Sequence, residues 1–539
     1  MTDIVLRVEN LRVAFGERVV VDNIGFTLRR GETFALVGES GSGKSMSALA
    51  VMGLLPFNAT RSAHTLQRHE QNLLDLPETA RQRLRGGDIA MIFQDALTAL
   101  NPVQRIGQQI EEVLILHRTL SRAARKARVI ELLQQVELPD PARRYHAYPH
   151  QLSGGQRQRA MIAMALAGEP SVLIADEPTT ALDVTVQAQI LQLLKTLQQR
   201  YGMALWLISH DLALVATLAD HIAVMQHGRI VETGPCPQFF SRAQHPYTRQ
   251  LLAALPNIDH CTQRMPMERP PLLRVEDLQI YYPIRKGLFQ RVVGHVKAVD
   301  SVSFSIQRGK TLALVGESGC GKTTLGKGLL NLLPMRGGQI WLDGVALQTL
   351  RGEALRRQRA AIQIVFQDPF ASMNPRMLIA DIIAEGLLAL RPELDRVARH
   401  AIVAKLLQQV GLPEDSMQRY PHEFSGGQRQ RICIARALAV QPKLVVCDEP
   451  TSALDVSVQA QILALLKNLQ REYDISYLFI THDLALVGEI ADDVAVMHQG
   501  RIVEFGPTAQ VLTQPRHPYT QTLLAAAPRL QTGIAESAV

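Results

Sequence analysis

The chain has 539 residues, 47% hydrophobic and 20% charged, and 57 basic against 50 acidic residues give a net charge of +7. This length exceeds that of a typical domain of ~100–200 residues, so we expect several domains. No uninterrupted run of about 18 apolar residues occurs, which excludes a membrane-spanning helix, and the first residues lack the apolar segment of a signal peptide.

Five scattered cysteines without a CxxC pair argue against a disulfide framework or a zinc module and favour reduced thiols in a cytosolic protein. They are Cys236, Cys261, Cys320, Cys433 and Cys447. The modest positive charge suits nucleic acid, an anionic membrane face or simply a solvated surface, and by itself it does not choose among them.

The sequence contains two copies of one pattern. The segment VGESGSGKS (37–45) returns as VGESGCGKT (315–323), and DEPTTALDVTVQAQIL from Asp176 returns as DEPTSALDVSVQAQIL from Asp448. The offset is 322 − 44 = 278 at the lysines and 448 − 176 = 272 at the aspartates, with 367 − 94 = 273 at two glutamines, so a length change falls between Lys44 and Gln94. We therefore predict a first domain over 1–255, a Pro-rich linker over 256–271, a second domain over 272–530 and a tail over 531–539.

The predicted elements of each copy alternate between strand and helix. Apolar runs at 33–38 (TFALVG) and 171–176 (SVLIAD) read as buried strands, and 185–199 reads as a helix. The stretch 96–148 is helical in pattern and has a counterpart at 370–420. We predict an α/β fold with a mainly parallel sheet and a helical subdomain in each copy.

The first chemical motif in chain order follows the strand at 33–38 and precedes a helix. It fits G-x-x-x-x-G-K-[ST], a loop whose backbone N–H groups surround phosphate while its lysine reaches the β- and γ-phosphates and its hydroxyl serves Mg²⁺. The residues are Gly38, Glu39, Ser40, Gly41, Ser42, Gly43, Lys44 and Ser45, and again Gly316, Glu317, Ser318, Gly319, Cys320, Gly321, Lys322 and Thr323.

Two acids close the strand at 171–176 and its repeat. An acid at the end of a buried strand is costly unless it is hydrogen-bonded or serves an ion. We expect Asp176 and Asp448 to support Mg²⁺, and Glu177 and Glu449 to polarise an attacking water.

In their order, the P-loop, FQD, SGGQRQR, DEP, ALD and HD motifs resemble the nucleotide-binding domain of ABC transporters, and they do so twice over nearly the whole chain. The resemblance implies two tandem P-loop NTPase domains of the ABC type, each with an antiparallel β part beside its parallel sheet. It also implies that each ATP lies between two domains, one giving the P-loop and the other the SGGQ signature. The signature opens a helical run, so Ser153 and Gly155 can aim a hydroxyl and a backbone N–H at a γ-phosphate.

Carried over by motif, the resemblance implies two composite sites within one chain. The first sets Lys44, Ser45, Gln94, Asp176, Glu177 and His210 against Ser425, Gly427 and Gln428. The second sets Lys322, Thr323, Gln367, Asp448, Glu449 and His482 against Ser153, Gly155 and Gln156. Gln94 and Gln367 would serve both Mg²⁺ and the catalytic step, and the histidines would contact the γ-phosphate.

Four more residues receive roles from the same resemblance. Asp183 and Asp455 match the acid that communicates between sites, and Phe15 and Tyr282 match the aromatic that stacks on adenine, with Tyr281 competing for the last role. A strand aromatic is more often part of a core.

The segments HPYTRQLLAALP (245–256) and HPYTQTLLAAAP (517–528) resemble the end of the peptide/nickel importer subfamily, and the fused chain resembles the ATPase of microcin C and oligopeptide importers. This implies ATP and Mg²⁺ as cofactors, two permease subunits as partners, and indirectly an external binding protein. It also implies a peripheral position on the cytoplasmic side of the inner membrane, at its anionic face, without nucleic acid. Glutathione or nickel cargo remains open, as does a different class, a soluble tandem-ABC translation factor.

Overall fold

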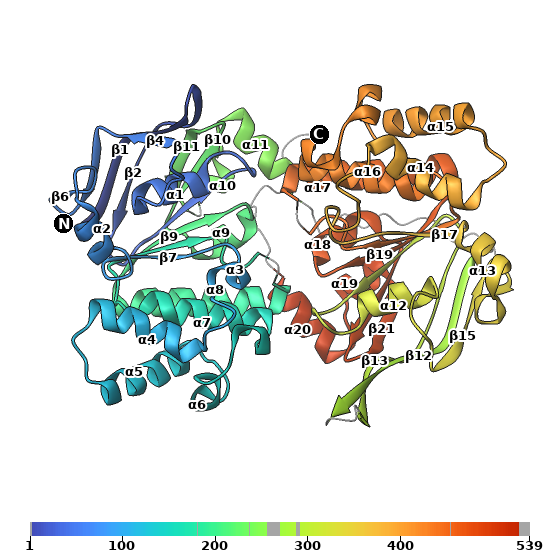
Figure 1. Ribbon diagram of the computed structural model, residues 1–539, viewed down its shortest axis with the longest axis horizontal. Helices are drawn as coiled ribbons and strands as arrows, with labels where there is room; N and C mark the ends of the chain where they lie inside the picture. The colour runs from blue at the N-terminus through green and yellow to red at the C-terminus, as the bar shows by residue number, and fades with distance from the viewer. Residues whose placement is uncertain are drawn as a thin grey trace. The chain divides into compact units, whose positions relative to one another are not determined.

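The computed structural model describes residues 3–180, 182–236, 238–255, 270–286, 291–452 and 454–527. The predicted linker, apart from residues 270 and 271, and the predicted tail lie outside these ranges. The chain forms two compact units, the first built from residues up to 182 and 186–254 and the second mainly from 255–527. Figure 1 shows strands and helices in each. No helix in the described ranges has the length and apolar character needed to cross a bilayer.

The first unit is built on a six-stranded sheet of order β11-β10-β3-β9-β8-β7, parallel except for the edge strand β11. Its strands are β3 (Thr33–Val37), β7 (Ile89–Ile92), β8 (Val172–Asp176), β9 (Ala204–Ser209), β10 (His221–Gln226) and β11 (Arg229–Pro235). Every residue of β3, β8 and β9 is buried, as expected for parallel strands covered on both faces. Parallel pairing brings the carboxyl ends of these three strands to one edge of the sheet.

A second, antiparallel sheet has the order β2-β1-β5-β6, and its strands come before and after β3 in the chain. It contains β1 (Ile4–Phe15), β2 (Arg18–Arg29), β5 (Thr65–Arg68) and β6 (Gln71–Asn72), and β4 (Ala59–Ser62) also pairs with β1. The predicted antiparallel part is thus confirmed.

The helices of the first unit include the predicted helical stretch at 96–148. They are α1 (Lys44–Met52), α2 (Glu78–Leu84), α3 (Ala96–Ala99), α4 (Ile106–His117), α5 (Arg122–Gln135), α6 (Pro141–Arg144), α7 (Gly154–Leu166), α8 (Val184–Tyr201), α9 (Leu212–Leu218), α10 (Gln238–Ser241) and α11 (Pro246–Ala253).

The second unit repeats both sheets, in the orders β17-β18-β19-β14-β20-β21 and β13-β12-β15-β16. Its strands are β12 (Leu273–Lys286), β13 (Arg291–Ile306), β14 (Thr311–Val315), β15 (Gly337–Leu342), β16 (Val345–Ala346), β17 (Ile362–Val365), β18 (Leu444–Asp448), β19 (Ser476–Thr481), β20 (Asp493–His498) and β21 (Arg501–Pro507). Its helices are α12 (Lys322–Leu329), α13 (Gly352–Arg359), α14 (Ile379–Leu390), α15 (Arg396–Gln409), α16 (Gly426–Leu438), α17 (Val456–Tyr473), α18 (Leu484–Ile490), α19 (Thr508–Thr513) and α20 (Pro518–Ala526).

The two copies differ mainly in their antiparallel sheets. The predicted length change after the P-loop falls where the first unit has the short strands β4 and β5 and the second has the single strand β15. A second difference was not predicted: two residues separate β1 from β2, whereas the hairpin of β12 and β13 is longer and extends from the body of its unit (Figure 1).

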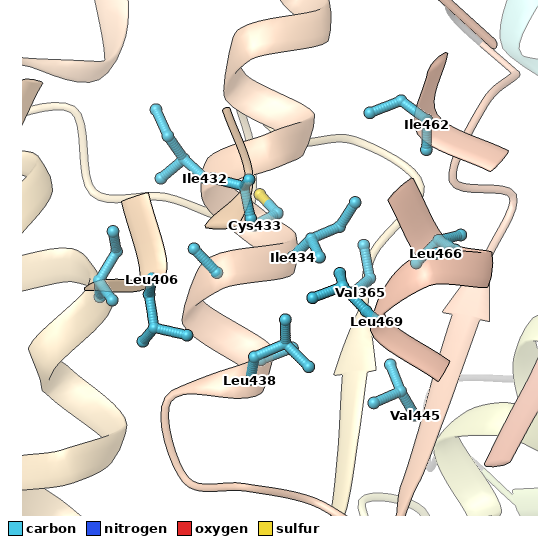
Figure 2. Packing of buried hydrophobic residues seen from close by; sticks show 14 of the residues in the cluster. Val365, Leu406, Ile432, Cys433, Ile434, Leu438, Val445, Ile462, Leu466 and Leu469 are labelled. Atoms are coloured by element: carbon cyan, nitrogen blue, oxygen red, sulfur yellow. The ribbon is translucent and has the colours of Figure 1, made fainter. Parts of the chain in front are cut away.

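Buried side chains join the helices to the parallel sheet. Figure 2 shows this core in the second unit, where α16 and α17 meet the strands β17 and β18. The labelled side chains are Val365, Leu406, Ile432, Cys433, Ile434, Leu438, Val445, Ile462, Leu466 and Leu469.

Each unit holds one of the chain's two tryptophans. Trp206 on β9 is fully buried, and its ring centroid lies 4.7 Å from that of Phe26. Trp341 on β15 is half-buried, with the Arg274 guanidinium 5.1 Å from its ring centroid.

Candidate functional site

The P-loop connects β3 to α1 in the first unit and β14 to α12 in the second. Gly43 and Gly321 precede the two helices with φ of 106° and 112°, a region that side chains disfavour. A Cβ on Gly43 would lie 2.8 Å from the Val20 carbonyl oxygen, and one on Gly321 would lie 2.0 Å from that of Ala298. The loop can take this compact form only with glycine at these positions.

The P-loop lysines are buried and bonded to their own loops. Lys44 Nζ donates to the carbonyl oxygens of Gly38 (2.8 Å) and Glu39 (2.9 Å). Lys322 Nζ donates to those of Gly316 (2.7 Å) and Glu317 (2.9 Å). The charge is therefore compensated before any phosphate arrives, which a buried ammonium requires.

The predicted magnesium residues meet at the carboxyl edge of the sheet. Ser45 Oγ donates to Asp176 Oδ1 at 2.9 Å, and Thr323 Oγ1 donates to Asp448 Oδ1 at 3.0 Å. Burial raises the pKa of Asp176 to about 6, against the opposing effect of the Ser45 bond, and burial likewise raises the pKa of Asp448. A hydroxyl and a buried carboxylate that lacks full compensation are ligands suited to a hard divalent cation such as Mg²⁺.

Glu177 directly follows β8, and three side chains contact its carboxylate. Gln94 Nε2 donates to Glu177 Oε2 at 2.8 Å, His210 Nδ1 lies 3.2 Å from Oε1, and Thr180 Oγ1 donates to Oε2 at 3.0 Å. Burial alone would raise the pKa of Glu177, but His210, Thr180 and Lys44 together outweigh burial, and the pKa is lowered to about 2. The carboxylate is ionised at neutral pH, the form that accepts a proton from water.

The second copy repeats this cluster with one change. Gln367 Nε2 donates to Glu449 Oε2 at 2.9 Å, and His482 Nδ1 lies 3.3 Å from Glu449 Oε1. Burial lowers the pKa of His482, but the carboxylates of Glu449 and Asp483 together outweigh burial, and the net pKa is raised. Ser452, the counterpart of Thr180, donates instead to the Glu449 backbone carbonyl.

The signature residues lie on a different element from the P-loop, at the start of α7 and of α16. Ser153 Oγ accepts from the Gln156 N–H at 3.3 Å while the Gln156 side chain accepts from the Ser153 N–H, a reciprocal capping arrangement. A Cβ on Gly155 would lie 2.6 Å from Val186 Cγ1. Ser425, Gly427 and Gln428 repeat the arrangement.

The remaining assignments lie at element ends. Asp183 Oδ1 accepts from Thr185 Oγ1 at 2.7 Å, and Asp455 is the N-cap of α17. Phe15 ends β1, half-buried. Tyr281 donates its hydroxyl to Asp300 and lies under the Arg336 guanidinium, whereas the Tyr282 side chain is 41% exposed. This favours Tyr282 over Tyr281 as the aromatic available to a base.

Two kinds of residue near the site were missed by the sequence reasoning. Thr180 belongs to the DEPTT motif, but its contact with Glu177 was not predicted. Tyr247 and Tyr519 were quoted within HPYT, yet their hydroxyls contact the P-loop backbone. The signal was the recurrence of HPYT in both copies, but nothing local indicated the contact.

A family model described as "ABC transporter" matches residues 21–180 and 299–452. A model described as "Oligopeptide/dipeptide transporter, C-terminal region" matches residues 231–277 and 503–538.

Individual relatives are similar to the chain over nearly its full length. The chain is 48% identical to the peptidoglycan transport ATP-binding protein YejF of Agrobacterium fabrum, over 98% of this chain and 97% of the relative. It is 49% identical to the glutathione import ATP-binding protein GsiA of Escherichia coli K12, over 97% of this chain and 89% of the relative. Among solved structures, cbiO1 from Clostridium perfringens matches with a TM-score of 0.39 and 28% identity, over 46% of this chain and 92% of that one.

Proposed function

The chain belongs to the ABC transporter family, with two ATP-hydrolysing domains, and we propose that it energises a membrane importer of peptides. The observation that supports this most is the oligopeptide/dipeptide transporter region that follows each ATP-binding domain. The same region argues against the soluble translation-factor class.

The side chains proposed to hold Mg²⁺ and to activate the attacking water already contact one another in the structure. Ser45 and Asp176 would hold the cation that neutralises phosphate charge, and Gln94, whose amide donates to Glu177, would be a further ligand. Glu177 would take the proton of the attacking water, since its carboxylate is ionised and fixed by His210 and Thr180. In the second copy Thr323, Asp448, Gln367, Glu449 and His482 would act in the same way.

We further propose that each ATP is completed by the signature of the other copy. Ser153 uses a lone pair of its hydroxyl to cap α7, so the O–H proton remains able to donate to a phosphate oxygen. The helix N-terminus adds a favourable dipole for the anion.

The pairing is tested by counting occluded nucleotide per chain in a Glu177→Gln/Glu449→Gln background. Lys44→Ala with Ser425→Arg places both lesions in one composite site, so the other site should still trap nucleotide. Lys44→Ala with Ser153→Arg damages both sites, and trapping should vanish. The reverse pattern would mean that each copy completes its own site.

The partners proposed are two permease subunits in the inner membrane, with the chain peripheral on its cytoplasmic side. An external binding protein would act through the permeases, the net charge of +7 suits an anionic membrane face, and no nucleic acid is involved. Cysteines at Thr98 and Ser372, beside the Gln94 and Gln367 segments, should cross-link to a membrane subunit. Cross-linking to ribosomes instead would support the translation-factor class.

The cargo is tested by uptake of a labelled tripeptide, of labelled glutathione and of labelled nickel in cells that lack the gene. Wild-type chain should restore peptide uptake, and the Glu177→Gln/Glu449→Gln chain should not. Restoration of glutathione uptake alone would favour a glutathione importer, the alternative that the similarity to GsiA supports. Restoration of nickel uptake alone would favour a nickel importer.

A further inference from the structure

A tyrosine contacts the P-loop backbone in each copy, and no role has been given to it so far. The Glu39 N–H donates to the Tyr247 hydroxyl oxygen at 3.3 Å, across 208 residues of sequence. The Glu317 N–H donates to the Tyr519 hydroxyl oxygen at 3.1 Å, across 202 residues. The same contact built twice, in units that differ elsewhere, is unlike an incidental surface approach.

The tyrosine of the first unit is held by hydrogen bonds at the start of α11. The Glu232 carboxylate on β11 accepts from the backbone N–H groups of Gln244 (2.7 Å) and His245 (3.2 Å). His245 Nδ1 caps the helix by accepting from the Tyr247 N–H at 3.2 Å. Only 6% of Tyr247 is exposed.

The second unit repeats these supports at the start of α20. Glu504 accepts from the N–H groups of Arg516 (2.8 Å) and His517 (3.1 Å), and His517 Nδ1 accepts from the Tyr519 N–H at 3.2 Å. Burial raises the pKa of Tyr519 to about 12, so the hydroxyl is neutral under ordinary conditions and accepts through a lone pair.

The P-loop residue that the tyrosine contacts is held from its other side by the P-loop lysine. Lys44 Nζ donates to the Glu39 carbonyl, while Tyr247 accepts from the Glu39 N–H. To reach phosphate, the ammonium must exchange this carbonyl for phosphate oxygens. The tyrosine contact uses the N–H of this residue and not its carbonyl, so the exchange does not require that contact to break.

We propose that Tyr247 and Tyr519 are positioning residues for ATP binding, each fixing the second residue of its P-loop so that the loop keeps its phosphate-receiving shape when the lysine leaves it. The HPYT segments are then part of the nucleotide site and not merely appended helices. The inference rests on ATP binding by the chain and does not depend on the cargo.

The test is the affinity for MgATP of the full chain, measured by calorimetry in the Glu177→Gln/Glu449→Gln background. Tyr247→Phe/Tyr519→Phe removes two hydroxyls and keeps both rings. A hydrogen bond of this kind contributes about a two- to tenfold change in equilibrium, so the dissociation constant should rise by that factor. In the chain with both glutamates intact, KM for ATP should rise similarly while kcat at saturating ATP changes little.

A matched control removes tyrosine hydroxyls that bond elsewhere in the same units. Tyr145 donates to Glu111 at 2.7 Å, and Tyr477 donates to the Leu466 carbonyl at 3.1 Å. Tyr145→Phe/Tyr477→Phe should lower thermal stability without changing affinity. An equal loss of affinity in this control would overturn the proposal, as would an affinity of Tyr247→Phe/Tyr519→Phe within error of the parent.

A second pair of variants acts on the helix cap. His245→Ala/His517→Ala should lower the affinity for MgATP, and His245→Asn/His517→Asn should restore it, because asparagine also accepts from the second helical N–H. Equal affinities of the two double variants would contradict the proposal. A parent chain that binds no ATP would instead refute the ATPase assignment itself.

Discussion

Two neighbouring acids of the first site should affect folding stability with opposite signs. The pKa of Asp176 is raised from 3.8 to about 6, and that of Glu177 is lowered from 4.5 to about 2. At 1.36 kcal/mol per pH unit, each difference corresponds to about 3 kcal/mol. Asp176→Asn should therefore stabilise the nucleotide-free chain at pH 7.5, and Glu177→Gln should destabilise it.

The signs follow from which state holds the proton. The folded state binds a proton at Asp176 more tightly than the unfolded state, so stability falls as pH rises from about 4 to about 6 and the full cost is present above. Glu177 has the opposite linkage: its contribution is present above pH 4.5 and is lost as pH falls toward 2. At pH 5 the stability gained by Asp176→Asn should thus be about half of its value at pH 7.5. The stability lost by Glu177→Gln at pH 5 should be nearly as large as at pH 7.5.

Scanning calorimetry of the nucleotide-free chain measures both effects. For a domain of about 250 residues, 3 kcal/mol corresponds to a shift of ~6 °C in the melting temperature. Asp448→Asn should raise the melting temperature of the second unit. As a control, Glu112→Gln, which changes an exposed acid on α4, should shift the melting temperature of the first unit by under ~1 °C. Shifts of the same sign for Asp176→Asn and Glu177→Gln at pH 7.5 would refute the reasoning.

Three further predictions concern activity and packing. Glu177→Gln or Glu449→Gln alone should lower transport-coupled ATP turnover by ~10²–10⁴, the usual contribution of a general base; turnover near wild type in either would show that the two sites are not both required. Gly321→Ala should abolish ATP binding at the second P-loop, since its Cβ would lie 2.0 Å from a carbonyl oxygen, and retained binding of two ATP per chain by calorimetry would contradict this. Gly427→Ala places a Cβ 2.5 Å from Val458 Cγ1 and should lower the melting temperature. Adding Val458→Ala to this variant should restore the melting temperature but not the ATPase activity. Recovery of both would mean that the glycine serves packing alone.

The sequence was sufficient for those parts of the site that depend on local chain order. The P-loop, Asp176, Glu177 and His210 each end or follow an apolar run, and parallel pairing of those strands brings them to one edge. The contacts that were missed depend on distant segments or on side-chain geometry. Tyr247 contacts Glu39 although the two residues are 208 positions apart in the sequence. The choice between Tyr281 and Tyr282 depends on the hydrogen bond from Tyr281 to Asp300.

The placement of the two tryptophans allows the unfolding of each unit to be followed by intrinsic fluorescence. Trp206 is fully buried and packs against the Phe26 ring in the first unit, so its emission should lie at short wavelength and move to the red when that unit melts. Trp341, half-buried beneath a guanidinium in the second unit, should emit at longer wavelength and move less. Emission recorded at two wavelengths during heating can therefore separate the melting of one half from that of the other without a dye or an introduced label.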